Sequence, residues 1–552
     1  MSNNPNAISS PSAPTWQNWS GNLVHKPAAD GVNYYFAPTS LADLKSALAQ
    51  VAKIPGATMR VSGQRHSQPP LVADDNRNSV PAKTTEFLVD MSCYCDLGPG
   101  QNQSIVLGPG TNQVTVNAGV RENALDAFLT QNNLMMKTVT AGGFFSIGGM
   151  TAVDVHGGTV NAPIFAETAS AFNILLADGT VKTIDATLPP VNGWSPLQFA
   201  RVSLGGLGIV TSITLDVVPR PSATTLQGGA TRYLLEDKAA FIAQFQQLLT
   251  GPSKHDRMEV FYSPYAAAPN LPWFHLKNFL VLWWNENTNS GPANSATAPE
   301  TACELMQEGK FGAALLGGLA KYAAQYVRGS QYFSNPYLPP LFPPVPTSGY
   351  VAIALDEIER QAAAANKINS DLWLAASSQV MFMSYFFEMP NLDAMGLGKV
   401  WDGLDVVARR VIQDDNFHIA APIEFRFVKA GNSAMSGSYS TNPNVWFINL
   451  DLIGFIEPTP VANYPNLLLQ FFADVERDWV ALGGVTHNGK MYGFYDPKAA
   501  PGTHSAGAFN PNFLADLRAR RGAPLTAYST YRQSIDPKGL FYSNFLRQLL
   551  EP

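Results

Sequence analysis

The chain has few cysteines, few charges and no long apolar run. Its 552 residues include only three cysteines, Cys93, Cys95 and Cys303. Cys93 and Cys95 are too close in sequence for an easy disulfide, and a Cys-x-Cys pair alone makes a poor zinc site, so we expect reduced structural thiols. No stretch reaches the roughly 18 to 20 apolar residues of a transmembrane helix.

The start of the chain also lacks a targeting signal. Residues Met1 to Pro14 are polar, without the basic and hydrophobic regions of a signal peptide. We therefore expect a cytoplasmic protein, or a secreted one if a signal peptide was removed before Met1.

Charge and composition narrow the class of protein. Charged residues make up 14% of the chain, the net charge is −6, and no run is rich in Lys or Arg. This disfavours nucleic acid and anionic membranes as main partners. With 46% hydrophobic residues, 44 Gly and 41 Pro, the composition indicates a compact, loop-rich globular protein. At this length, two large domains are the natural expectation.

The first 220 residues mix helix and strand patterns. Ser40 and Asp43 are spaced like a capping box, and a helix with one apolar stripe is expected to follow. Alternating strands are predicted at 103–107, 113–117 and 209–218. Pro219 ends the last of these, and we place a domain boundary there.

Residues 221–470 have a different texture, rich in aromatic side chains. The segment from Tyr332 to Tyr350 carries many prolines and is unsuited to a sheet. A lid over a large hydrophobic cavity and a packed interdomain loop explain it equally well. The tryptophans of this region are Trp273, Trp283, Trp284, Trp373, Trp401 and Trp446.

One turn contains the most informative residues of the chain. A short strand at 57–61 runs into a turn with one histidine that follows two arginines, beside small residues. Free backbone N–H groups and positive charge in such a turn suit a pyrophosphate. A structural histidine is the alternative reading. The residues expected at the ligand are Arg60, Ser62, Gly63, Gln64, Arg65, His66 and Ser67.

A second glycine-rich segment spans residues 141–158. Double glycines around a small hydrophobic patch indicate a close backbone approach to a flat ligand. His156 is interpreted as structural, facing that ligand at most. The residues expected near the ligand are Gly142, Gly143, Ser146, Gly148 and Gly149.

Other cofactor signatures are missing. Gly206-x-Gly208 is followed by Thr211 where a dinucleotide fingerprint has its third glycine, and it leads into a strand. The sequence also has no P-loop, and no His/Asp/Glu cluster has metal-ligand spacing, so no metal is expected.

Together, the His66 turn, Ser146-Ile147-Gly148-Gly149 and residues 205–211 resemble the vanillyl-alcohol-oxidase family of flavoproteins. The resemblance implies an α+β fold: a two-subdomain FAD-binding domain over 1–220, to which 500–552 returns, and a large α+β substrate domain over 221–499. It implies FAD joined at its 8α carbon to His66; a noncovalent pyrophosphate contact is the alternative. It adds Gly208, Ile209 and Val210 to the cofactor site. It also adds Asn544, because the segment from Ile535 to Asn544 looks like a motif near the C-terminus of that family.

Within that family, the covalent-FAD (class II) cholesterol oxidases are the most similar group. Residues 145–157 look like their second glycine-rich segment, and Pro422 to Arg426 is similar to their Glu-x-Arg pair. Residues 257–259 resemble the strand that carries a second active-site glutamate, here Glu259. The group's active-site asparagine falls at Asp451, or at Asn449 if the alignment shifts by two.

The Glu-x-Arg pair has a clear chemical use beside a flavin. Glu424 and Arg426 are two residues apart on an expected strand, so both face the same side. Glu424 would accept the proton of a substrate hydroxyl, with its pKa raised by burial. Arg426 would stabilise negative charge on the reduced flavin or on the developing alkoxide. An ordinary ion pair is the alternative.

The other acidic candidates have less defined uses. Glu259 is either a second base, able to shift a proton in a Δ5-to-Δ4 isomerisation, or a structural carboxylate. Asp451 or Asn449 would hydrogen-bond the substrate oxygen or orient the glutamates. If Asp451 lies in the pocket, three carboxylates share it and at least one is expected to be protonated.

The sequence thus predicts an FAD-dependent alcohol oxidase that reduces O2 to hydrogen peroxide, with a 3β-hydroxysterol as the leading substrate. An oxidase of a smaller polar alcohol, a sugar alcohol or aldonolactone, is the main alternative, because Glu-x-Arg occurs in those relatives too. A flavin-binding protein without turnover is a third reading. A pocket lined by Glu259, Asp451 and Lys or His would favour the polar alcohol, and an apolar pocket the sterol.

Overall fold

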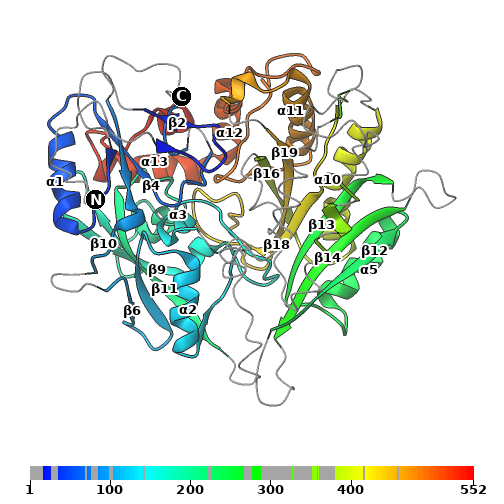
Figure 1. Cartoon of the computed structure of the whole chain (residues 1–552), viewed down its shortest axis with the longest axis horizontal. Coiled ribbons are helices and arrows are strands. Elements are labelled where there is room, and N and C mark those ends of the chain that lie inside the picture. Colours follow the sequence, from blue (N-terminus) through cyan, green and yellow to red (C-terminus); the bar gives the residue numbers. More distant parts are fainter. Residues whose placement is uncertain are drawn as a thin grey trace, which may run out of the picture.

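The computed structural model is an α+β structure with two lobes, which confirms the predicted fold class (Figure 1). The proline-rich segment 332–350, Cys303 and Gly142 lie outside the described residues. None of the described helices combines the length and the apolar character needed to cross a membrane. The structure describes residues 16–26, 35–68, 71–75, 85–97, 103–140, 143, 145–220, 226–266, 276–286, 326–327, 351–352, 354–356, 358–359, 380–413, 417–456 and 459–551.

The first lobe begins with a small parallel sheet that carries the His66 turn. Its strand order is β3-β5-β4, and α1 packs on it with the apolar stripe expected from the sequence. The side chain of Ser40 caps this helix by accepting a hydrogen bond from the N–H of Asp43 at 3.2 Å. The bounds are β3 Tyr35–Phe36, α1 Leu41–Val51, β4 Thr58–Ser62 and β5 Glu86–Asp90.

A second, antiparallel sheet forms the rest of the first lobe. Its order is β10-β9-β11-β7-β6, with β8 added to β11. The predicted strands at 113–117 and 209–218 are present as β7 and β11, and the predicted boundary falls directly after β11. The bounds are β6 Ile105–Leu107, β7 Gln113–Asn117, α2 Glu122–Gln131, β8 Leu134–Met136, α3 Ile147–Ala152, β9 Ala169–Leu175, β10 Val181–Asp185, α4 Pro196–Ala200 and β11 Ile209–Pro219.

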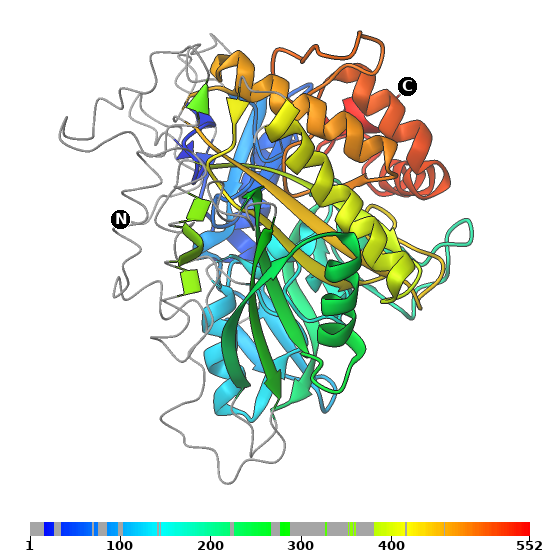
Figure 2. The same ribbon diagram turned by 90° about the vertical axis from the view of Figure 1, so that its right-hand side faces the viewer.

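The second lobe is built on a seven-stranded antiparallel sheet of order β12-β14-β13-β18-β19-β16-β20. Helices α5, α10 and α11 cover one face of this sheet (Figure 2). The bounds are β12 Leu226–Leu235, α5 Lys238–Thr250, β13 Arg257–Ala266, β14 Lys277–Glu286, β16 Val380–Met389, α10 Ala394–Gln413, β18 Ile423–Lys429, β19 Trp446–Phe455, α11 Asn466–Ala481 and β20 Val485–Thr486.

Residues alternate across this sheet, and the alternation defines the inner face. Phe425 of β18 packs against Phe245 of α5, with ring centroids 5.8 Å apart. The side chains directly before and after Phe425 therefore face the first lobe. Glu424 and Arg426 are those side chains. The helices thus cover one face, while the other face is available to form a site.

The chain returns to the first lobe at its C-terminus (Figure 1). Tyr531 stacks on Phe199 at 5.1 Å, and the N–H of Met59 donates to the carbonyl of Leu540 at 2.8 Å. This agrees with the predicted return of 500–552, although the exact domain division stays a prediction. The remaining elements are β1 Trp16–Gln17, β2 Val24–His25, β15 Tyr326–Val327, β17 Phe417–His418, α12 Pro511–Arg521, α13 Ala523–Ile535 and α14 Asn544–Leu550.

The cysteines differ from the prediction in one respect. Cys93 and Cys95 are free thiols, as expected, but both are exposed and do not pack in the core. Cys93 ends a single 3₁₀ turn whose first residue, Met91, is buried. The turn therefore directs its apolar residue inward and leaves the thiols at the surface.

Candidate active site

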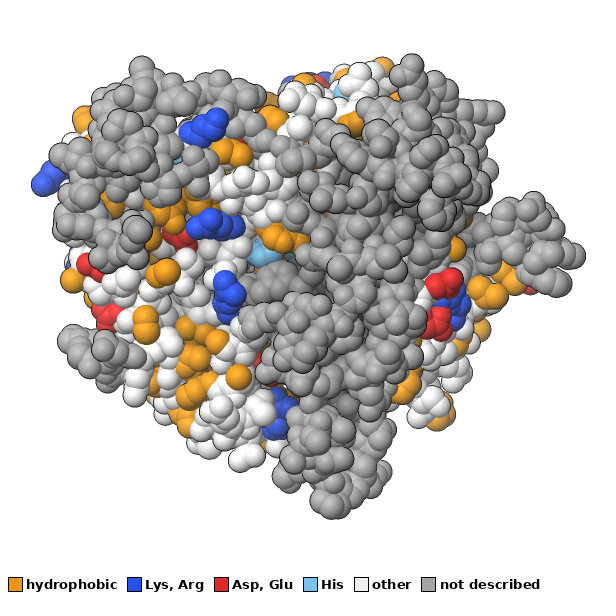
Figure 3. All heavy atoms as spheres, in the orientation of Figure 1, with side chains coloured by type: hydrophobic (Ala, Val, Ile, Leu, Met, Phe, Trp, Pro, Cys, Tyr) orange, Lys and Arg blue, Asp and Glu red, His pale blue; other side chains and the backbone are white. Residues whose placement is uncertain are grey.

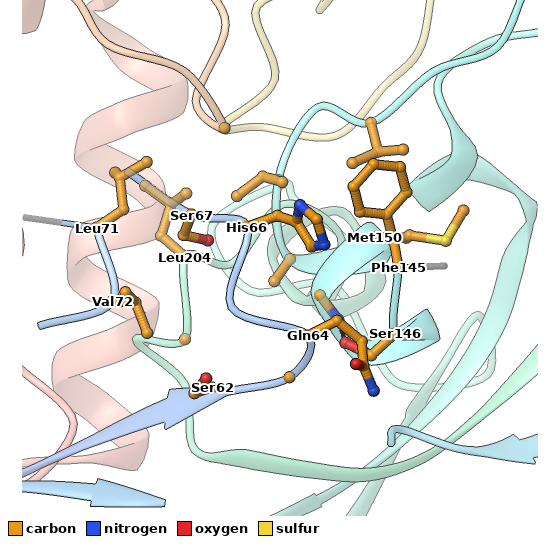
Figure 4. A pocket seen from close by; sticks show the side chains of 18 of the residues that line it. Ser62, Gln64, His66, Ser67, Leu71, Val72, Phe145, Ser146, Met150 and Leu204 are labelled. Carbon is orange, nitrogen blue, oxygen red and sulfur yellow. Dashed lines mark hydrogen bonds between the residues drawn. The ribbon is translucent and has the colours of Figure 1, made fainter. Parts of the chain in front are cut away.

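A pocket of about 270 Å³ lies between the two lobes. One side consists of the His66 turn and α3, and the other consists of β18, β19 and the turn that follows β20. Figure 4 shows His66, Phe145 and Met150 grouped at this pocket, with Ser62, Gln64 and Ser146 nearby. Both glycine-rich segments singled out in the sequence therefore meet at one cavity.

The His66 turn is held in an unusual backbone conformation. Arg65 has a φ of +64°, and its guanidinium donates to Asp90 Oδ2 at 2.8 Å. The hydroxyl of Tyr35 donates to the same oxygen at 2.6 Å. A non-glycine residue with positive φ costs energy, so this buried acceptor stabilises the bend that directs His66 to the pocket.

His66 is enclosed by aromatic rings. Its ring centroid is 5.1 Å from that of Trp19 and 4.8 Å from that of Phe145. Burial, reinforced by the charges of Lys490 and Arg121, lowers the pKa of His66 to about 3. The imidazole is therefore neutral at physiological pH and keeps a nitrogen lone pair, as attachment to a flavin requires. The attachment itself stays a prediction.

Close backbone packing fits a planar group such as that of FAD. A Cβ on Gly63 would lie 1.9 Å from Ser146 Oγ, and a Cβ on Gly148 would lie 2.8 Å from that of Ala118. Gly208, with a φ of +141°, also lines the pocket. Side chains at these positions would collide with neighbouring chain segments and push the pocket walls apart, so the glycines keep the walls in the arrangement into which the predicted cofactor fits.

Most of the predicted cofactor residues line the pocket. Arg60 does so while its guanidinium pairs with the buried Glu86 at 3.3 Å, so its charge is already balanced there. The predicted residues that line it are Arg60, Ser62, Gly63, Gln64, Arg65, His66, Ser67, Ser146, Gly148, Gly149, His156, Gly208 and Val210.

Three predicted cofactor residues do not line the pocket. Ile209 points into the core of the small parallel sheet, because β11 alternates its side chains. The N–H of Gly143 donates to Thr140 Oγ1 at 3.0 Å. The amide of Asn544 donates to Asp74 Oδ2 at 3.1 Å. These residues support the walls, and any contact with the cofactor is unsupported by the geometry.

The predicted acidic and basic residues meet on the inner face of the second-lobe sheet. Glu424 and Asp451 are opposite each other on β18 and β19, and both line the pocket with Arg426. Arg426 Nε donates to Glu259 Oε1 at 2.9 Å, and its Nη2 pairs with both Glu259 and Glu424. Glu259 is buried behind Arg426 and does not line the pocket.

This arrangement changes the titration of Glu424. Burial raises the pKa of Glu424 well above its usual range. Arg426 opposes that shift, while the negative charges of Glu259 and Asp451 increase it. Glu424 therefore takes up and releases a proton at a higher pH than an ordinary glutamate.

The structure separates the two alternatives for the polar residue on β19. Asp451 lines the pocket. Asn449 is fully buried, and its amide donates to Ser384 Oγ at 2.9 Å instead. The two residues are two positions apart on one strand, so their side chains point to the same face of the sheet. The difference therefore arises from their positions along the strand and not from side-chain direction.

Two basic residues of the pocket were missed in the sequence. His487 and Lys490 lie in the turn after β20. The ammonium of Lys490 is 3.9 Å from the ring centroid of Phe382. The available signal was His-Asn-Gly-Lys directly after a short strand, but nothing local ties that turn to residues more than 300 positions away.

His487 has a defined tautomer. Its Nδ1 accepts a hydrogen bond from the N–H of Gly489 at 2.9 Å, and its ring stacks on Phe386 at 5.5 Å. Burial, with His156 and Lys490 nearby, lowers the pKa of His487 well below its usual range. The ring is thus neutral with its proton on Nε2, which makes it a donor. In the space-filling view, histidine atoms are visible in the middle of one face, with basic side chains beside them (Figure 3).

Comparisons with known proteins relate the two lobes to an FAD-binding domain and to a lactone oxidase. Residues 32–185 match the family model of the FAD binding domain, and residues 399–549 match that of D-arabinono-1,4-lactone oxidase. An L-gulono-1,4-lactone dehydrogenase of Mycobacterium tuberculosis is 29% identical over 254 residues, which are 46% of this chain and 50% of that one. An L-gulonolactone oxidase of Mus musculus is 23% identical over 282 residues, 51% of this chain and 53% of that one. The chain spans about half the length of these curated relatives.

Solved structures extend the likeness to the whole chain. A cholesterol oxidase from B. sterolicum superposes with a TM-score of 0.66 at 15% identity and covers 99% of both chains. At that identity the likeness shows the fold. With the matched FAD-binding domain and the pocket between the lobes, it confirms the predicted resemblance to the vanillyl-alcohol-oxidase type of FAD flavoproteins.

Proposed function

We propose that this protein is an FAD-dependent oxidase of a small polyhydroxylated alcohol or an aldonolactone, with O2 as the electron acceptor. The observation that carries this proposal is the polar lining opposite His66, made of Glu424, Arg426, Asp451, His487 and Lys490. The sequence predicted that a pocket lined by Glu259, Asp451 and a Lys or His would favour a polar alcohol; Asp451, His487 and Lys490 line it, and Glu259 does not. All five residues also fall within 399–549, the span that matches the lactone oxidase model.

Desolvation argues for the same class of substrate. Glu424 and Arg426 pair with each other, but a sterol ring would bury Asp451, His487 and Lys490 without giving them hydrogen-bond partners, at about 2–7 kcal/mol for each unpaired group. The hydroxyls of a sugar alcohol or the oxygens of a lactone supply partners. His487 and Lys490 would donate to such oxygens, while Asp451 would accept from a hydroxyl.

The residues divide the chemistry between them. Bound FAD supplies the acceptor for the hydride of the substrate C–H bond, and O2 takes up the two electrons as hydrogen peroxide. Glu424, when deprotonated, accepts the proton of the reacting hydroxyl. Arg426 stabilises the negative charge that develops on that oxygen. Glu259 keeps Arg426 in place through their ion pair.

A 3β-hydroxysterol remains the second candidate, supported by the whole-chain fold likeness to cholesterol oxidase. Isomerisation by Glu259 has less support, because this carboxylate is covered by Arg426 and is not part of the pocket lining. A carrier without turnover is disfavoured, since it would have no need of a glutamate with a raised pKa beside the pocket.

The test is anaerobic bleaching of the bound flavin. The holoenzyme is mixed with xylitol, sorbitol, L-gulono-1,4-lactone, D-arabinono-1,4-lactone and cholesterol in separate experiments, and the visible absorbance is followed. Bleaching by a polyol or lactone, followed by peroxide formation when air is admitted, is expected. Bleaching by cholesterol alone would overturn the proposed substrate class, and bleaching by a polyol without peroxide formation in air would overturn the role of O2.

A further inference from the structure

A buried carboxylate joins the two lobes directly behind the pocket. Asp154 follows α3 and lies between Val153 and Val155, which both line the pocket, and its side chain is fully buried. Its Oδ2 accepts hydrogen bonds from the backbone N–H of Asn488 at 2.8 Å and from the side-chain amide of Asn488 at 2.6 Å. Its Oδ1 accepts from the N–H of Gly437 at 3.2 Å. One carboxylate of the first lobe therefore holds two loops that follow strands of the second.

The loop held at Asn488 carries pocket residues. His487, Gly489 and Lys490 are its neighbours in sequence, and all three line the pocket. The N–H of Lys490 donates to the carbonyl of His487 at 3.2 Å, which closes a turn around Asn488. The side-chain amide of Asn488 also donates to the carbonyl of Met435 at 2.6 Å. Displacement of the turn would break the hydrogen bonds to Asp154.

The turn has little room to move. A Cβ on Gly489 would lie 3.1 Å from Val153 Cγ2 and 2.9 Å from His487 Cε1. At its end, the charge of Lys490 is close enough to contribute to the lowered pKa of His66, which faces it across the pocket. The position of the turn therefore sets the distance between this charge and the cofactor side of the site.

We propose that Asp154 is a positioning residue that sets where Lys490 and His487 stand at the pocket, and so controls the affinity of the site for anionic and hydroxyl-bearing ligands. The inference rests on the proposed function. Asp154 acts through the turn, because its oxygens are occupied by N–H donors and its side chain is buried behind the pocket wall. Without the carboxylate, those donors would be buried with no acceptor, at a cost of about 1–3 kcal/mol each.

The chain offers a matched pair of substitutions. Asp154→Asn keeps the shape, but it removes the charge that strengthens these bonds and places an amide against one of the N–H donors, which weakens the hold on the turn. Glu167 makes a similar link away from the pocket: its Oε1 accepts from the N–H of Asn432 at 2.8 Å and from that of Ser433 at 2.7 Å, and neither residue lines the pocket. Glu167→Gln therefore tests loss of a link between lobes without a change at Lys490.

Sulfite is a suitable probe, because it is an anion that adds to oxidised flavin, bleaches it and is not a substrate. Titration of the holoenzyme should give a Kd about tenfold higher for D154N than for the parent protein. A similar rise is expected for K490M, and the Kd of the double variant should rise by less than the product of the single effects, since Asp154 acts in part through Lys490. E167Q should lower Tm but leave the sulfite Kd unchanged.

Two results would overturn the inference. One is an unchanged sulfite Kd in D154N, and the other is a double variant whose Kd rises by the product of the single effects. If D154N does not fold, N488A replaces it, because it removes one of the bonds to Asp154 and should raise the Kd in the same direction. The sulfite result does not depend on which alcohol is oxidised, so failure of the proposed substrate class is seen separately in the bleaching panel.

Discussion

Glu424 is the residue on which the proposed proton transfer depends, and its surroundings oppose its ionisation. Burial, Glu259 and Asp451 raise its pKa, and Arg426 only partly offsets them. A base must be deprotonated to accept a proton, so the active form accumulates as the pH rises through this raised pKa. The value of kcat/KM should therefore increase with pH along a limb above the usual range of a glutamate, near 4.5.

The variant Glu424→Gln should remove both the activity and this limb. We expect flavin reduction at least ~100-fold slower, with a rate independent of pH where the parent enzyme shows the limb. Anaerobic stopped-flow mixing with the best substrate of the panel, at several pH values, measures both. An unchanged rate would exclude Glu424 as the base.

A second buried glutamate provides the control for the pH limb. Burial raises the pKa of Glu122 to about 8, and this side chain accepts the N–H of Thr140 at 2.7 Å while pairing with its hydroxyl. In Glu122→Gln, the carbonyl can still accept and the amide can donate to the hydroxyl. E122Q should therefore keep the limb; if it loses the limb and E424Q keeps it, the titration belongs to Glu122.

The residues of the site were predictable to different degrees. A spacing of two on a strand was enough to bring Glu424 and Arg426 to one face. The pairing of Arg426 with Glu259 depends on β13 lying beside β18, which no local pattern specifies. His487 and Lys490 reach the pocket because Asp154, far away in sequence, holds their turn, and this contact has no signature in either segment.

At the scale of elements, the turn after β4 and the start of α3 must fit closely together. Glycine content predicted a close backbone approach to a flat ligand in residues 141–158. The structure places Gly148, like Gly63, close to other chain segments, and the approach to a ligand stays a prediction. Ile209, which the family resemblance added to the cofactor site, is on a strand whose alternation points its side chain to the core. Composition indicates a close approach, but side-chain direction requires the actual register.

The close fit can be tested by a substitution at Gly63 and by a second substitution at Ser146 that should restore flavin binding. In Gly63→Ala, the new Cβ would lie 1.9 Å from Ser146 Oγ, so the turn and α3 must separate and the cofactor slot must change. The purified variant should contain less flavin per protein, as measured by the ratio of visible to ultraviolet absorbance. The double variant G63A/S146G should recover flavin, because it removes the clashing side chain and glycine is tolerated at an N-cap.

Gly507→Ala is the control, since a Cβ there would meet no atom closer than 3.8 Å. Its flavin content should equal that of the parent protein. A G63A protein with full flavin content, or a double variant with no recovery, would contradict the assigned packing of the turn against α3.

At the scale of the whole molecule, the change in composition near residue 220 coincides with the end of the first lobe. Mixed short elements precede it, and long aromatic-rich strands of the second lobe follow it. The order of the seven-stranded sheet was not predictable, because β18 and β19 insert between β13 and β16 and so combine strands distant in sequence. The pocket arises only when the two lobes face each other, which explains why the glycine-rich segments named many residues on the first-lobe side of the lining, while the second-lobe side was predicted only in part.

Because both lobes line the pocket, attachment of the cofactor should be visible in the stability of the entire protein. If His66 is bonded to FAD, acid precipitation of the parent protein leaves the flavin in the pellet, whereas His66→Ala releases it to the supernatant. The H66A protein then binds FAD reversibly, so its Tm should rise with free FAD, by about 2.7 kcal/mol of stability at a hundredfold excess over Kd. The parent Tm should not respond. Yellow supernatant from the parent protein, with a Tm that depends on added FAD, would instead mean that His66 contacts a cofactor held without a covalent bond.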